Sequence, residues 1–157
     1  MVNREAAIKQ LHEWAAETAI ILGSGLSSVV HAVQIKSAET SYAEFSKIPK
    51  PRVPGHAGRF VLGKIDNRRT IFAQGRVHLY EGFSAREVTA LVRVLARAEV
   101  KQLVITNAAG AIKPRFKPGQ WMMITDHINL TGASPLVGTL RLPRWFRRRA
   151  DMLSSSI

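Results

Sequence analysis

Three short apolar runs, each followed closely by glycine or other small residues, place the strongest constraint on the fold of this chain. Runs of this length that are bounded by turn-forming residues are typical of buried strands. A segment with helical spacing of its apolar residues separates the second run from the third, and strand–helix–strand order favours a parallel crossover. We therefore expect the third run to lie parallel to the first. The runs are residues 19–22, 70–73 and 102–106.

Local patterns predict the elements around these strands. Residues 59–65 and 69–74 flank a polar turn at 66–68 and predict a β-hairpin. Ser84 is followed three residues later by Glu87, a capping box that starts a helix running to about residue 98. The other expected elements are a helix at 3–15, a helix after Ser28, a strand or edge segment at 39–47 anchored by Tyr42 and Phe45, a proline-rich connection at 48–54, and a buried strand at 121–125.

Composition narrows the class of protein. The chain has 157 residues, near the usual size of one domain, and 46% of them are apolar, which is enough for a core. It has no cysteine, so disulfides and thiolate metal sites are excluded. The N-terminus starts an amphipathic helix rather than a signal peptide, and no apolar run approaches the roughly 20 residues of a membrane span. We therefore expect a cytoplasmic protein that does not enter a membrane.

The net charge of +12 is high, and a basic surface attracts nucleic acid, anionic lipid or acidic ligands. Residues 137–157 are rich in arginine and supply +4 of this charge. Composition shifts near Leu136, where any domain boundary is expected. A basic, non-catalytic nucleic-acid-binding protein is one hypothesis, although a run of charge is more often solvated surface.

The stretch 74–80 holds the strongest candidate ligand group. Arg76 and His78 lie two residues apart, and in an extended segment that spacing aims both side chains at the same face. A guanidinium beside an imidazole suits a phosphate-like oxyanion. The sequence therefore predicts an oxyanion receptor directly after the second apolar run.

Three other loops have residues that suit the same ligand. Residues 23–25 form a glycine turn between a strand and a helix, where N–H groups favour an anion, but an ordinary strand–helix turn is the alternative because the dinucleotide and Walker motifs are not matched. Glycines on both sides of His56 can leave its ring exposed to a ligand. The alternative is that His56 is a loop histidine without a role. Residues 106–110 allow a ligand to touch the backbone. Asp126 and His127 suggest a metal or acid–base pair, but a structural network is preferred because no third ligand is suitably spaced.

Taken together, five motifs strongly resemble the purine nucleoside phosphorylases of the trimeric, inosine–guanosine type. They cover about residues 5–136 in the family's order and spacing. The resemblance implies an α/β fold with a mixed, largely parallel central β-sheet flanked by helices. It also implies phosphorolysis of purine (deoxy)ribonucleosides to the free base and (deoxy)ribose 1-phosphate, with inorganic phosphate as co-substrate and no cofactor or metal. The motifs are residues 21–26, 53–59, 74–82, 104–110 and 125–130.

The resemblance assigns roles to residues in the matched motifs. Ser24 corresponds to the hydroxyl that holds phosphate, and Arg76 and His78, with Val77 between them, to the phosphate-binding segment. Ala108 corresponds to a backbone donor near phosphate and ribose. The remaining assignments are His56 close to the phosphate, His78 and His56 as the catalytic histidines, and Tyr80 beside the ribose. Methylthioadenosine phosphorylases share the fold and are the alternative within the family.

The chain also departs from the family. Family members are nearly twice as long, and their purine-binding acid and amide have no counterpart here. We therefore interpret residues 1–136 as the N-terminal part of the phosphorylase domain, 137–157 as an atypical arginine-rich tail, and the chain as a truncated or frame-shifted product. Purine-binding residues are then expected to be absent, catalysis to be absent or very weak, and a homotrimer to be the family's assembly.

Overall fold

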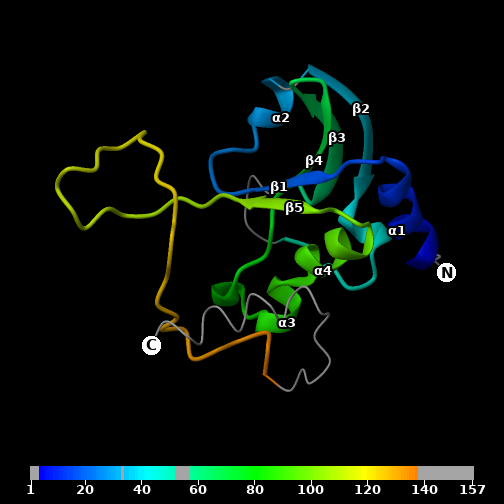
Figure 1. The fold of residues 1–157 in the computed structure, drawn as a ribbon. Helices are drawn as coiled ribbons and strands as arrows, with labels where there is room; N and C mark the ends of the chain where they lie inside the picture. The colour runs from blue at the N-terminus through cyan, green and yellow to red at the C-terminus, as the bar shows by residue number, and fades with distance from the viewer. Residues whose placement is uncertain (1–3, 33, 52–56, 138–157) are drawn as a thin grey trace.

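The computed structural model describes residues 4–32, 34–51 and 57–137, and its centre is a five-stranded sheet (Figure 1). The strand order across the sheet is β2-β3-β4-β1-β5. The strands are β1 (Thr18–Leu22), β2 (Gln34–Ser41), β3 (Arg59–Ile65), β4 (Arg68–Gln74) and β5 (Gln102–Ile105).

Strand β1 has parallel neighbours on both sides. Its register with β4 pairs Thr18 with Thr70, and its register with β5 pairs Thr18 with Gln102. The pairs β2–β3 and β3–β4 are antiparallel. The predicted α/β class with a mixed sheet is therefore confirmed, as is the parallel pairing of the first and third apolar runs. The parallel part consists of β4, β1 and β5, whose carboxyl ends lie at the same edge of the sheet.

The hairpin β3–β4 forms as the sequence predicts. Its turn residues Asp66 and Asn67 have positive φ angles of 46° and 64°. Two successive left-handed residues give a turn whose twist matches that of the paired strands, and Asn and Asp tolerate this conformation better than most residues. The polar dipeptide therefore sets the register of β3 against β4.

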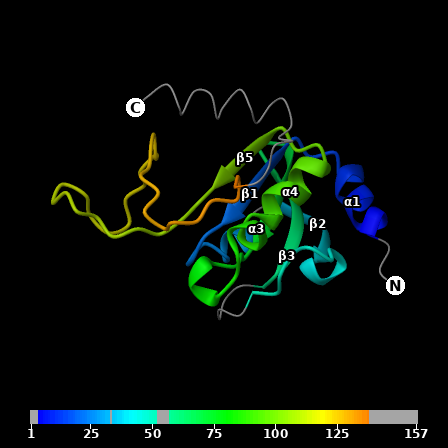
Figure 2. The ribbon, with the colours of Figure 1, turned by 90° about the horizontal axis from the view of Figure 1, so that it is seen from below.

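Helices cover the two faces of the sheet unequally (Figure 2). On one face, α1 (Arg4–Glu13), η1 (Tyr42–Glu44) and α4 (Ala90–Arg97) surround the larger core, which includes Leu11, Phe60 and Leu95. On the other face, the short helix α2 (Val29–Ala32) supplies Val30 to a smaller cluster with Val61 and Phe72. The predicted anchors Tyr42 and Phe45 are both buried in the larger core.

The helix expected from Ser84 to about residue 98 forms in two parts. The capping box is confirmed, because Ser84 Oγ accepts from Glu87 N and the Glu87 carboxylate accepts from Ser84 N. Thr89 then separates α3 (Ala85–Val88) from α4, and its hydroxyl donates to Ala85 O at 2.9 Å. A short 3-10 turn, η2 (Leu79–Glu81), precedes α3.

The chain leaves the sheet after β5 (Figure 1). Residues 106–137 are irregular and largely exposed, so the prediction of a buried strand at 121–125 is wrong. Trp121 and Met123 are 78% and 85% exposed, because no neighbouring strand or helix in the described ranges covers them. Of the helices within the described ranges, none is long and apolar enough to cross a membrane.

Candidate functional site at the carboxyl ends of β4, β1 and β5

Three of the four predicted ligand loops follow neighbouring parallel strands. Residues 75–78 follow β4, residues 23–25 follow β1, and residues 106–110 follow β5. Ligands of open α/β sheets bind in the crevice outside the carboxyl ends of the strands, where loops from adjacent strands meet. The order β4-β1-β5 thus brings together segments that are more than 80 residues apart in the sequence.

Thr106 joins these loops through three short hydrogen bonds. Gly23 N donates to Thr106 Oγ1 at 2.8 Å, and the same hydroxyl donates to Ile21 O at 3.1 Å. Arg76 Nη1 donates to Thr106 O at 2.8 Å. Because β1 lies between β4 and β5, this last bond carries the Arg76 side chain across the end of β1. The guanidinium therefore lies at the same sheet edge as the glycine loop.

Two glycines allow this close arrangement. A Cβ atom on Gly23 would lie 2.5 Å from Thr106 O, so the ends of β1 and β5 approach too closely for any side chain there. Gly75 has a φ angle of 97° and ends β4 at Gln74. The extended segment expected to run through Arg76 and His78 is therefore interrupted at its start, since the left-handed residue turns the chain before Arg76.

Arg76 is a half-buried cation. Burial lowers the pKa of its guanidinium, and Tyr80 opposes that shift, but arginine keeps its charge at neutral pH. A partly desolvated guanidinium interacts more strongly with an anion than an exposed one, because the local dielectric is lower. The site therefore has a fixed positive charge at the same sheet edge as the glycine loop.

His78 is held by its neighbours in the chain. His78 N donates to Glu81 Oε1 at 2.8 Å, and the imidazole and Glu81 N complete a reciprocal capping box. The ring stacks on Tyr80, with centroids 4.9 Å apart and planes inclined by 12°. The Nε2 atom of the ring is buried. Since the capping contact orients the ring, the predicted site residues His78 and Tyr80 form one unit after β4, with Tyr80 exposed toward solvent.

Gln74, the last residue of β4, supports the glycine loop from below. It is 4% exposed, and its Nε2 donates to Ser27 O at 3.0 Å. Arg59 Nε donates to Gln74 Oε1 at 2.8 Å, and Gly58 N donates to Gln74 O at 2.9 Å. The segment that follows His56 thus enters the sheet at the same edge. His56 itself lies outside the described residues.

The remaining predicted residues at this edge differ in their exposure. Ser24 and Ala108 are both exposed, in the loops after β1 and β5, whereas Val77 is buried with 4% exposure. Asp126 Oδ1 accepts from His127 N at 2.8 Å. Because no strand forms at 121–125, this local bond is not part of the strand-end network that was expected for the dipeptide. Among the described residues, no group of three or more His, Asp or Glu side chains is placed to hold a metal ion.

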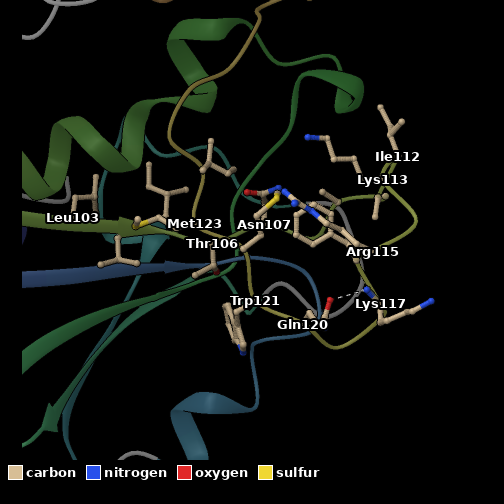
Figure 3. A pocket seen from close by; sticks show the side chains of 18 residues that line it. Leu103, Thr106, Asn107, Ile112, Lys113, Arg115, Lys117, Gln120, Trp121 and Met123 are labelled. Carbon is tan, nitrogen blue, oxygen red and sulfur yellow. Dashed lines mark hydrogen bonds between the residues drawn. The ribbon is translucent and has the colours of Figure 1, made fainter.

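A hollow of about 860 Å³ adjoins the cluster along the outer side of β5 (Figure 3). Thr106 and Asn107 line it, but Ser24, Arg76 and His78 do not. Most of its wall comes from residues 109–124, whose side chains are largely exposed. The strand-end cluster, which is tied by short hydrogen bonds, is therefore the better-defined candidate site.

Sequence reasoning missed the roles of Thr106, Gln74 and Arg59. All three are in the motifs quoted above, but none was given a function. One signal was available for Thr106, since a hydroxyl residue at a strand end beside a glycine turn can satisfy loop N–H groups. The bonds of Gln74 and Arg59 cross between strands, and their partners are not evident without the sheet order.

The fold and these strand-end residues define an α/β domain suited to receiving an oxyanion between three parallel strand ends. The chain belongs to the phosphorylase superfamily, whose family model matches residues 17–151.

Within this superfamily, the chain is similar to individual proteins named purine nucleoside phosphorylase. It is 41% identical to purine nucleoside phosphorylase 1 of Bacillus subtilis (strain 168) over 87% of this chain and 51% of that protein. It is 45% identical to purine nucleoside phosphorylase of Bos taurus over 78% of this chain and 42% of that protein. A crystal structure of purine nucleoside phosphorylase in complex with ribose-1-phosphate matches at a TM-score of 0.61 and 32% identity, covering 73% of this chain and 42% of the other. The chain thus spans about half the length of the curated relatives it matches.

Proposed function

We propose that this chain is a purine nucleoside phosphorylase polypeptide whose described residues form the phosphate side of the site. The reaction is phosphorolysis, in which inorganic phosphate attacks C1′ of a purine (deoxy)ribonucleoside and releases the free base and (deoxy)ribose 1-phosphate. The similarity to a phosphorylase solved with ribose-1-phosphate supports this substrate class. No cofactor or metal takes part in the proposed reaction.

The position of Arg76 is the observation that carries this proposal. Its side chain spans the end of β1 and is fixed by Thr106 O at 2.8 Å. A phosphate dianion needs charge-assisted donors, which contribute roughly 1.5–3 kcal/mol each. Arg76 can supply one such donor from below, and the Ser24 loop can supply hydroxyl and N–H donors from the next strand end.

The other predicted residues complete the proposed site. His78 and the neighbouring Val77 segment border the phosphate after β4, and the Ala108 N–H approaches it after β5. Tyr80 is proposed to pack beside the ribose, and His56 to act with His78 on the phosphate. The departing base leaves through an oxocarbenium-like transition state, as in glycoside hydrolysis, so a correctly oriented phosphate lowers the barrier.

The 157-residue polypeptide is expected to bind phosphate but to turn over nucleoside slowly or not at all. Asn107 and Ala108 are exposed, and the chain beyond them lacks regular structure as far as residue 137. Catalysis needs reacting groups held close to their productive geometry, and small misplacements cost large factors in rate. An ordinary turnover of about 1–1000 per second with inosine and phosphate would contradict this expectation.

Phosphate-dependent stabilisation tests the proposal. At a phosphate concentration tenfold above Kd, the folded state gains about 1.4 kcal/mol, which raises the melting temperature by several degrees. Arg76→Ala is expected to abolish the rise. Arg68→Ala is the matched control, because Arg68 is an exposed arginine at the other end of the same strand. Equal phosphate shifts in wild type and Arg76→Ala would refute the proposed site.

Assembly and location are further proposals. From the resemblance we infer that the chain forms a homotrimer and is located in the cytoplasm. We also propose that residues 1–136 are the N-terminal part of the phosphorylase domain and that residues 137–157 are an atypical tail. The nucleic-acid alternative gains no support from the described residues, because the arginine-rich segment that suggested it lies almost wholly outside them. The methylthioadenosine alternative is likewise not favoured by any specific contact at the site.

A further inference from the structure

The hydroxyl of Thr106 determines which N–H groups of the glycine loop can face a ligand. A threonine hydroxyl has one proton, and here that proton points to Ile21 O at 3.1 Å. A lone pair of the same oxygen then accepts from Gly23 N at 2.8 Å. The Gly23 N–H is therefore directed into the protein, and an anion above the loop meets the N–H groups that follow it, beginning with Ser24.

The carbonyl of Thr106 makes the second contact at the same junction. It accepts from Arg76 Nη1 at 2.8 Å, so one residue contacts both the glycine loop and the guanidinium. The backbone of Thr106 is itself tied to β1, since Thr106 N donates to Ile21 O at 3.1 Å. The spacing between the loop and Arg76 thus depends on a single residue at the end of β5.

We propose that Thr106 is a positioning residue for phosphate. It acts through Gly23 and Arg76 and does not touch the ligand. Its side chain holds the loop, and its main chain holds the cation, so that both are fixed relative to one residue. This inference rests on the proposed function, because it names the residue that sets the geometry of the proposed phosphate site.

Two substitutions separate the hydroxyl from the shape of the side chain. Thr106→Val keeps the β-branched shape and removes the bonds to Gly23 and Ile21. Thr106→Ser keeps the hydroxyl and is the conservative rescue. Thr70→Val is the matched control, because Thr70 is a buried threonine of β4 whose hydroxyl donates to Arg68 O at 3.3 Å, at the opposite end of the sheet.

Titration calorimetry with inorganic phosphate gives the first readout. Thr106→Val is expected to bind phosphate about tenfold more weakly than wild type, the factor that corresponds to one hydrogen bond. Thr106→Ser and Thr70→Val are expected to stay within about twofold. Equal affinity of wild type and Thr106→Val would overturn the inference, as would an equal loss in Thr70→Val, which would indicate a general loss of stability.

Backbone amide spectra of the wild-type chain give a second readout that needs no variant. Without phosphate, the Gly23 amide is expected to exchange slowly. On adding phosphate, the Ser24 and Gly25 amide signals shift while Gly23 changes little. A fast-exchanging Gly23 amide would overturn the inference even if Thr106→Val does not fold. If the Gly23 amide is protected from exchange but wild type binds no phosphate, both the positioning role and the proposed function fail. If wild type binds phosphate but the Gly23 amide is not protected, only the inference about Thr106 fails.

Discussion

The substitution Gly23→Ala tests the close approach of β1 and β5 on which the site depends. The added Cβ atom would lie 2.5 Å from Thr106 O and 3.0 Å from Asn107 Cα, both of which are main-chain atoms. An ordinary contact begins at 3.4 Å, so the two strand ends must separate by about 0.9 Å. No side chain can rotate away to relieve this contact.

The expected cost follows from that displacement. Overpacking a well-packed position costs about 1–3 kcal/mol. The same movement lengthens the bond between Gly23 N and Thr106 Oγ1 beyond hydrogen-bonding distance, which adds about 1 kcal/mol. We therefore expect Gly23→Ala to reduce the free energy of unfolding by about 2–4 kcal/mol, and to weaken phosphate binding because Thr106 also holds Arg76.

Urea denaturation measures this loss. With a slope of about 2 kcal/mol per molar urea, the midpoint should fall by about 1–2 M at an unchanged slope. Gly110→Ala is the matched control in the loop after β5, since a Cβ atom there meets nothing within 4 Å. It should stay within about 0.5 kcal/mol of wild type. Coincident unfolding curves for Gly23→Ala and Gly110→Ala would refute the close approach described here.

Two further substitutions test the supports of the site. Gln74→Leu removes the two side-chain bonds that link the glycine loop to Arg59. It should lower the free energy of unfolding by about 1–3 kcal/mol, measured by urea denaturation. Gln102→Leu is the control, because Gln102 is an exposed strand residue, and it should change the free energy of unfolding little. Tyr42→Phe removes the buried hydroxyl that donates to Gly75 O at 2.8 Å, and should cost about 1 kcal/mol at neutral pH. Burial raises the pKa of Tyr42 in the folded chain, so its contribution is present below about pH 10, the ordinary tyrosine value, and declines above it. Stability measured from pH 8 to 11 should therefore fall more steeply in wild type than in Tyr42→Phe, and parallel curves would contradict this.

Elements that depend on local signals were predictable from the sequence. The turn at Asp66 and Asn67 and the capping box of Ser84 with Glu87 need only neighbouring residues, and both form. The parallel pairing of β1 and β5 followed from strand–helix–strand order. The place of β4 on the other side of β1, which brings the third ligand loop to this edge, could not be predicted from local signals.

Elements that depend on distant partners were harder to predict. Residues 121–125 have the composition of a buried strand, yet Trp121 is 78% exposed because burial requires a covering layer that composition does not supply. Strand β2 begins at Gln34, earlier than expected, because its partner β3 rather than its own polar sequence determines its extent. The contacts of Thr106 with Gly23 and Arg76 were missed for the same reason.

A crystal structure of the chain grown with inorganic phosphate tests the central claim most directly. We expect the phosphate at the carboxyl end of β1, with an oxygen about 2.7–3.2 Å from the Arg76 guanidinium and others facing the Ser24 loop. Phosphate bound instead to Lys113 or Arg115 beside the hollow along β5, or no phosphate at the β1 edge at saturating concentration, would contradict the account.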